Sequence, residues 1–176
     1  MRDVDVEARL TRLEDVEAIR DLVARYGFAI DDRDLDGVKV LFATEGSLQT
    51  ASGPSKGKGV DAVGDYFAGR FAVLGPTHHF THDHVIDFDP ADPAIAHGRV
   101  AAHAEVWRDG RPMLTALRYL DTYVKKPEGW RFLSRTQAYL YFVDVRQYPE
   151  ALGAKLRVRT GETEADWKPA DWPAGL

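Results

Sequence analysis

The sequence predicts an α+β domain in which a curved antiparallel sheet wraps around N-terminal helices and forms a cone. Residues 12–32 and 60–74 space their apolar side chains as helices do, whereas residues 78–142 alternate them as strands do. Strands of about a dozen residues twist and coil, so such a sheet does not stay flat. The open mouth of the resulting cone is a natural ligand pocket.

The longest predicted helix spans residues 12–32. Apolar residues form one stripe along it, and Thr11 with Glu14 matches a capping box at its start. Its opposite face is charged in the first turns and apolar or small in the last turns, which predicts that the C-terminal end lies inside the protein. Asp31 and Asp32 therefore occupy a buried helix end.

Shorter elements follow this helix. The sequence predicts a short helix at residues 34–42 and a strand at residues 46–50. Residues 51–59 are rich in Gly, Ser and Lys, but they lack the glycine spacing and the Gly-Lys-Ser/Thr end of a phosphate loop. We therefore expect a surface loop there, followed by the helix at residues 60–74.

Long strands make up the second half of the chain. Segments rich in Asp, Pro and Gly separate them, which predicts an antiparallel meander. Residues 146–176 are expected to pack as a tail on a neighbouring surface, and residues 1–176 to form one domain. The predicted strands lie at residues 78–88, 95–107, 113–125 and 130–142.

The composition excludes several classes of protein. The chain has no cysteine, which excludes disulfides, thiolate nucleophiles and iron–sulfur clusters. Its formal net charge of −5 disfavours a nucleic-acid partner. No run reaches the ~18 apolar residues of a membrane span, so no membrane partner is expected. The charged residues 1–11 lack the apolar core of a secretory signal, so we expect a cytoplasmic protein.

Histidines are the densest chemical signal, and three interpretations of them stay open. In the first, His82 and His84 share one strand face and bind a metal together with His103 or Glu105. In the second, the histidines are exposed or hydrogen-bonded to loop carbonyls. The second interpretation is favoured for His78, His82, His84 and His97.

The third interpretation is general acid–base catalysis by His79 and Asp31. Imidazole titrates near neutrality, so it can accept a proton and return it. A buried carboxylate on its second nitrogen would fix the tautomer and stabilise the imidazolium. Asp31 is the candidate carboxylate, because an anion at a helix C-terminus opposes the helix dipole and such conflicts concentrate at functional sites.

Two further polar residues are candidate substrate-binding groups. Tyr26 lies on the apolar stripe of the first helix, from which its hydroxyl could reach the cavity. Arg118 shares strand parity with Leu114, Ala116 and Leu120, so it needs an anion partner. That partner is either a substrate oxyanion or an acidic side chain of the protein.

Three segments of the chain resemble SnoaL-like proteins of the nuclear-transport-factor-2-like superfamily. Residues 13–37 resemble their opening helix, residues 77–81 the strand with the catalytic histidine, and residues 123–132 the last hairpin. The resemblance implies the cone-shaped, cystatin-like α+β fold over about residues 8–145, with residues 146–176 as a C-terminal tail.

Within this superfamily the pattern is most similar to scytalone dehydratase and hexachlorocyclohexane dehydrochlorinase, which are eliminating enzymes without a cofactor. The resemblance implies that Asp31 and His79 form the Asp–His pair and that His103 is the second histidine. Residue 30 is Ile, where the fungal dehydratase has a tyrosine beside the aspartate.

We therefore expect a cofactor-independent lyase of the dehydratase type that acts on a small cyclic or aromatic hydroxylated molecule. His79 removes a proton, Asp31 orients it, and His103, with Tyr26, protonates the departing hydroxyl, while Arg118 stabilises developing negative charge. A proton-shuttling isomerase or a retro-aldol C–C lyase would use the same base.

Two other classes also stay open, namely a non-catalytic binding or scaffold domain and a metal-dependent enzyme that uses His82, His84 and His103. A homodimer or homotrimer is expected through the outer face of the sheet.

Overall fold

The computed structural model describes residues 6–161 and 163–172. Three helices and a hairpin come first: α1 (Val6–Asp31), α2 (Leu35–Val40), β1 (Phe42–Thr50), β2 (Ser55–Lys58) and α3 (Val60–Val73). The long strands are β3 (Leu74–Phe88), β4 (Ile95–Arg108), β5 (Arg111–Lys126) and β6 (Gly129–Asp144). The tail contains η1 (Val145–Gln147), α4 (Tyr148–Ala151), β7 (Leu156–Val158), η2 (Glu164–Asp166) and β8 (Lys168–Pro169).

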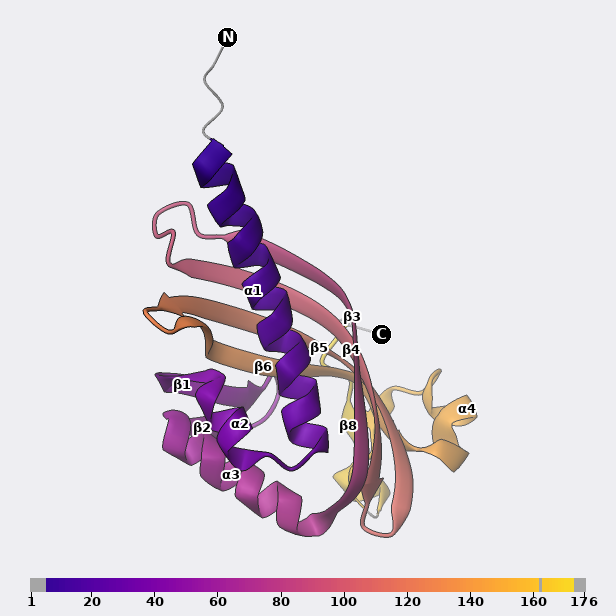
Figure 1. The fold of residues 1–176 in the computed structure, drawn as a ribbon. Helices are drawn as coiled ribbons and strands as arrows, with labels where there is room; N and C mark the ends of the chain where they lie inside the picture. The colour runs from indigo at the N-terminus through magenta and orange to yellow at the C-terminus, as the bar shows by residue number, and fades with distance from the viewer. Residues whose placement is uncertain (1–5, 162, 173–176) are drawn as a thin grey trace.

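The main sheet has the strand order β2-β1-β6-β5-β4-β3 and curves around α1 and α3 (Figure 1). The α+β class is confirmed, and β3 to β6 form the expected antiparallel meander. The expectation of a purely antiparallel sheet is wrong, because β1 pairs with β6 in parallel. Parallel neighbours need a long connection, and here α3 and three long strands separate the two in sequence.

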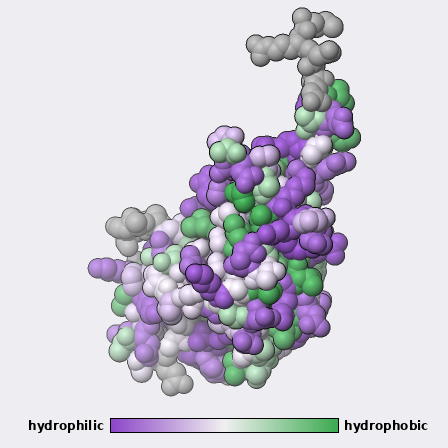
Figure 2. All heavy atoms as spheres, turned by 90° about the vertical axis from the view of Figure 1, so that its left-hand side faces the viewer, coloured by the Kyte–Doolittle hydropathy of each residue, from purple (hydrophilic) through white to green (hydrophobic). Residues whose placement is uncertain are grey.

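Two local expectations also need correction. Helix α1 begins at Val6, so Thr11 and Glu14 lie inside the helix and do not cap it. All residues from 6 to 14 are exposed, and Figure 2 shows this part of α1 standing out from the body of the molecule. The expected surface loop at 51–59 contains strand β2. None of the described helices combines the length and apolarity of a membrane span.

The core lies between the inner face of the sheet and the helices α1 and α3. Helix α1 presents its apolar stripe to the sheet, and the ring of Tyr26 touches aromatic rings from α3, β1, β5 and β6. Burial of this stripe is the main driving force that holds α1 in the cone. Buried members of the cluster include Ile19, Leu22, Val23, Val63, Phe67, Val100, Tyr119 and Phe132.

Helix α1 ends in a Schellman motif that fixes the position of Asp31. The amide of Asp34 donates to the carbonyl of Ala29 at 2.9 Å, and the amide of Arg33 donates to the carbonyl of Ile30 at 3.3 Å. Arg33 takes the left-handed position with φ of 60°, where glycine is usual. Its guanidinium turns back and donates to the Ile30 carbonyl at 2.7 Å, which closes the helix end.

A fully buried ion pair lies beneath the aromatic cluster. Both side chains of Arg135 and Asp121 are 0% exposed, and two hydrogen bonds of 2.9 and 2.7 Å join them. The guanidinium stacks within 4.2 Å of the ring centroids of Tyr26, Tyr119 and Phe132. Burial opposes its charge, but the Asp121 carboxylate outweighs burial and raises the pKa of Arg135.

Loss of this guanidinium is expected to destabilise the fold strongly. Arg135→Met leaves the Asp121 carboxylate buried without its ionic partner, so we expect a loss of roughly 3–5 kcal/mol in the free energy of unfolding. Urea denaturation measures it. The control is Arg99→Met on the exposed face of β4, which is expected to change stability by less than about 0.5 kcal/mol. Equal stability of the two variants would contradict the structural role of the pair.

Candidate active site

The end of α1 and the start of β3 meet in a pair formed by Asp31 and His79. The Asp31 Oδ1 atom lies 2.6 Å from His79 Nδ1, and Oδ2 accepts the His79 backbone amide at 2.8 Å. The hydroxyl of Thr77 also donates to Oδ1 at 2.8 Å. The side chains of Asp31 and His79 are only 15% and 17% exposed. The structure thus brings together the two residues that the sequence singled out.

Three hydrogen bonds keep Asp31 ionised. Burial raises its pKa, but the hydrogen bonds from the His79 ring, the His79 amide and Thr77 outweigh burial and lower the pKa below 3.8. An ionised carboxylate only accepts hydrogen bonds, so Nδ1 of the neutral imidazole carries the proton. Its Nε2 then has a free lone pair, and no described residue is hydrogen-bonded to that atom. His79 is therefore set up as a base through Nε2.

Arg33 supports this pair through hydrogen bonds to the start of β3. Its guanidinium donates to the Thr77 hydroxyl at 2.9 Å and also to the carbonyl of Gly75. The Thr77 hydroxyl accepts a hydrogen bond from Arg33 and donates one to Asp31, so the Arg33 hydrogen bond orients the donor as well as the strand. The left-handed turn at Arg33 is thus tied to the position of the base.

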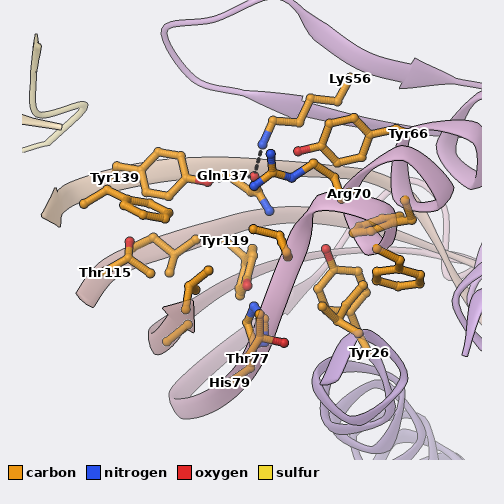
Figure 3. A pocket seen from close by; sticks show the side chains of 18 residues that line it. Tyr26, Lys56, Tyr66, Arg70, Thr77, His79, Thr115, Tyr119, Gln137 and Tyr139 are labelled. Carbon is orange, nitrogen blue, oxygen red and sulfur yellow. Dashed lines mark hydrogen bonds between the residues drawn. The ribbon is translucent and has the colours of Figure 1, made fainter. Parts of the chain in front are cut away.

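His79 lines a cavity of about 80 Å³ between α1, α3 and the inner face of the sheet. Figure 3 shows His79 and Tyr26 on one side of it, with Lys56, Tyr66 and Arg70 across from them. Apolar side chains fill most of the remaining wall, which suits a small organic molecule. They are Ile30, Phe67, Phe71, Leu74, Ala104, Val106, Leu117 and Phe142.

Tyrosine hydroxyls supply hydrogen-bond donors to the cavity. Tyr26 and Tyr119 are almost completely buried, and burial raises the pKa of Tyr26 and raises the pKa of Tyr119 to about 12. Burial likewise raises the pKa of Tyr66 and Tyr139. All four phenols are therefore protonated at neutral pH. The Tyr139 hydroxyl donates to Gln137 Oε1 at 3.0 Å, whereas those of Tyr26, Tyr66 and Tyr119 can donate to a substrate oxygen. Tyr26, a candidate substrate-binding residue from the sequence, lines this pocket.

Lys56 is a site residue that sequence reasoning missed. Its ammonium donates to Gln137 Oε1, and the rings of Tyr66 and Tyr139 lie 5.2 and 5.9 Å from it. Burial, together with the nearby charges of Arg70 and Arg108, lowers its pKa to about 7. Only the inward turn of the hairpin β1–β2 brings Lys56 here, so a local pattern offers no signal for it.

The structure does not bring His103 or Arg118 to this pocket. His103 is exposed on the outer face of β4, where its Nδ1 lies 2.9 Å from Nε2 of His82. Arg118 is exposed on the outer face of β5, and its guanidinium stacks 3.7 Å above the ring of Trp172. The roles expected for His103 as proton donor and for Arg118 as anion binder therefore have no geometric support.

The candidate metal ligands do not come together as a set of three, although His82 and His103 are neighbours. A bulge between Thr81 and His84 turns His84 inward, so His82 and His84 lie on opposite faces of β3. His84 Nε2 lies 3.1 Å from the Tyr123 hydroxyl, and burial lowers the pKa of His84 to about 4. Among the described residues, no three His, Asp or Glu side chains lie together as metal ligands.

The remaining histidines lie outside the cavity. His78 and His97 are exposed, and His97 Nε2 lies 3.8 Å from Asp89 Oδ2. The interpretation of these residues as surface groups agrees with their positions.

Replacement of Asp31 by Asn is expected to remove a pH-dependent contribution to stability. The folded pKa of Asp31 lies below 3.8, so its ionised form stabilises the fold above that pH and the contribution disappears as the pH falls through the folded value. We expect Asp31→Asn to cost about 1–3 kcal/mol at neutral pH. Urea denaturation of both proteins from neutral to acidic pH should show this difference shrinking below pH ~4.

Asp32→Asn is the matched control, because Asp32 is exposed and adjacent in sequence. Its effect on stability should be small at every pH. A difference between Asp31→Asn and the wild type that stays constant with pH would contradict an ionised, hydrogen-bonded Asp31.

Solved structures share this architecture. A candidate scytalone dehydratase from Novosphingobium aromaticivorans superposes with a TM-score of 0.70 at 22% identity, covering 76% of this chain and 89% of that chain. A type 2 hexachlorocyclohexane dehydrochlorinase also gives 0.70 at 17% identity, covering 78% and 93%. An NTF2-like protein with a cystatin-like fold from N. aromaticivorans gives 0.65 at 26% identity, covering 88% and 99%.

No curated protein sequence is significantly similar to the chain. The family model described as a SnoaL-like domain matches residues 11–136, which hold most of α1, the elements from α2 to β5, and the first part of β6. Because this match spans most of the chain and the fold agrees with it, the protein belongs to the SnoaL-like domain family of the nuclear-transport-factor-2-like superfamily.

Proposed function

We propose that the protein is a cofactor-independent lyase that carries out a dehydratase-type elimination on a small cyclic or aromatic hydroxylated substrate. The observation that carries this proposal is the 2.6 Å contact between Asp31 and His79, with Nε2 of His79 left free beside a cavity. The fold shared with a candidate scytalone dehydratase and a dehydrochlorinase supports the same reaction class.

In the proposed reaction, His79 Nε2 takes a proton from a carbon next to an activating carbonyl group. The electron pair of that C–H bond forms a C=C bond, and the adjacent C–O bond breaks. Asp31 stabilises the imidazolium that forms, since an ionised carboxylate 2.6 Å from Nδ1 favours its charged form. A positioned base of this kind contributes about 10²–10⁴-fold to the rate.

The leaving hydroxyl needs a proton, and the neutral phenols of Tyr26 and Tyr119 are the donors that line the cavity on the His79 side. The same hydroxyls can hold the substrate carbonyl while negative charge develops on it. They take the roles that the sequence analysis gave to His103 and Arg118. Return of the proton from His79 to another carbon would make the enzyme an isomerase instead.

Replacement of His79 is expected to abolish turnover in a screen of hydroxylated ring compounds. Loss of ring absorbance or gain of a conjugated product is followed by ultraviolet spectroscopy and mass spectrometry, which detect elimination and isomerisation alike. We expect His79→Ala to lower the rate by about 10²–10⁴-fold. Asp31→Asn is expected to lower kcat, because the imidazolium loses its counter-charge.

His103→Ala is the control, because this histidine lies on the outer face of the sheet. Its turnover should equal that of the wild type. Equal turnover by His79→Ala and wild type would remove the proposed base, and loss of activity in His103→Ala would contradict the assignment of the cavity.

We also propose that the protein is a homodimer or homotrimer through the outer face of the sheet. Large apolar side chains on this face stay exposed, namely Phe80, Val85, Trp107 and Leu120, which are 40–47% exposed. Light scattering coupled to size-exclusion chromatography is expected to give a multiple of 19.7 kDa at micromolar concentration. A Trp107→Glu variant should shift the mass towards the monomer, and a wild-type monomer would refute the proposal.

A further inference from the structure

A second cavity adjoins the one that contains His79. It has a volume of about 210 Å³ and shares Lys56, Tyr66, Arg70, Tyr139 and Phe142 with the inner cavity. These shared residues form the boundary between the two spaces. A molecule in the inner cavity therefore has His79 on one side and Lys56 and Arg70 on the other, at the boundary with the outer cavity.

The outer cavity is strongly cationic although the protein as a whole is acidic. Lys56, Arg70, Arg108 and Lys168 line it, whereas Asp171 is the one acidic residue among the described residues of its wall. The chain carries a formal net charge of −5. Such a local excess of positive charge inside a cavity attracts and orients anions.

The protein neutralises these cations only in part. Within the described residues, Lys56 and Arg70 form no ion pair, and Lys56 donates to the neutral amide of Gln137. Asp171 uses Oδ2 to accept the amide of Tyr139 at 2.7 Å. Arg108 meets Asp109 only through Nε, at 3.1 Å. A half-buried ammonium next to two guanidinium groups is costly without a counter-ion.

We propose that Lys56 and Arg70, with Arg108, bind an anionic oxygen group of the substrate, such as a carboxylate, while the substrate ring lies against His79. This inference rests on the proposed function and names the substrate class, which is a small ring compound with an acidic substituent. The positive charge also draws electron density away from the reacting carbon, so it favours loss of the proton to His79.

The C-terminal tail supplies part of the wall of the outer cavity, and this tail lies beyond the region that the SnoaL-like family model matches. Asp171 exchanges backbone and side-chain hydrogen bonds with Tyr139, and Trp172 donates to the carbonyl of Ala138 at 3.0 Å. The tail thereby lies along β6 and contributes Val158, Thr160, Lys168 and Asp171 to the wall. The family match ends at residue 136, before all of these residues.

The burial of Lys56 gives the proposal a second signature. Burial and the neighbouring guanidinium groups lower its pKa to about 7, so part of the population is neutral at neutral pH. An anion that binds beside it favours the ammonium form and raises this pKa. Anion binding should therefore take up protons near neutral pH.

The test compares the binding of para-hydroxybenzoate with that of para-hydroxybenzamide, which has the same ring and hydroxyl but no charge. Isothermal titration calorimetry at low ionic strength measures both ligands with the wild type and with the double variant Lys56→Met/Arg70→Met. We expect the wild type to prefer the acid by about tenfold or more. The double variant should lose this preference. Titrations in buffers of different ionisation enthalpy should show proton uptake with the wild type.

Lys58→Met is the matched control, because it removes the same charge two residues further along β2 from an exposed position outside both cavities. This variant should keep the preference for the acid, and so should the single variant His79→Ala. If the double variant does not fold, two other measurements take its place. One is the preference of the single variant Arg70→Met, and the other is the loss of the wild-type preference at high salt. Equal affinity for the acid and the amide, no binding of the acid at millimolar concentration, or a preference that survives Lys56→Met/Arg70→Met would overturn the proposal.

The His79→Ala binding experiment separates this proposal from the proposed function. An acid preference in His79→Ala together with equal turnover of that variant and wild type would leave the anion site intact and remove the base. Loss of turnover in His79→Ala, together with equal affinity of that variant for the acid and the amide, would leave the proposed base intact and remove the anion site.

Discussion

The hydrogen-bonded carboxylate of Asp31 is the constraint on which the proposed active site depends. An anion at a helix C-terminus is unfavourable, and the protein compensates with donors from the strand opposite, namely the Thr77 hydroxyl and both the amide and the ring of His79. The same bonds dock α1 on β3 and fix which nitrogen of His79 is free. Arg33 reinforces this arrangement because it holds both the helix end and Thr77. Stability and base chemistry therefore depend on one set of contacts.

Periodicity predicts most of the fold and the buried end of the first helix with Asp31, because a helix end is a local property. The choice of His79 among the histidines rests on the resemblance to SnoaL-like proteins. Periodicity fails at His103 and Arg118, whose side chains point outward. Around His103 the residues Val100 to Val106 alternate with the small and apolar ones buried, so the strand itself indicates that His103 points outward. Arg118 misled because Leu114 and Ala116, which share its strand parity, are apolar on the outer face, where they pack with Tyr148 and Ala151 of α4. Such a covered outer face is invisible to the pattern of one strand.

The cationic cavity is the part of the site that the sequence could not reveal. Lys56, Arg70 and Lys168 lie far apart in the chain, and only the inward hairpin β1–β2, helix α3 and the tail bring them to one wall. A run of Gly, Ser and Lys such as residues 51–59 resembles many surface loops, and nothing local distinguishes the lysine that turns inward. The site thus combines an inner part that lies mostly within the family match with an outer part that the tail completes.

The protonation state of the His79 ring tests the central claim most directly. Nitrogen-15 NMR of the uniformly labelled protein distinguishes the two neutral tautomers of each histidine, and His79→Ala identifies the signals of His79. The account predicts that neutral His79 carries its proton on Nδ1, towards Asp31, and has an unprotonated Nε2. Asp31→Asn should shift this equilibrium, while Asp32→Asn should not. A neutral His79 protonated on Nε2, or one indifferent to Asp31→Asn, would contradict the account.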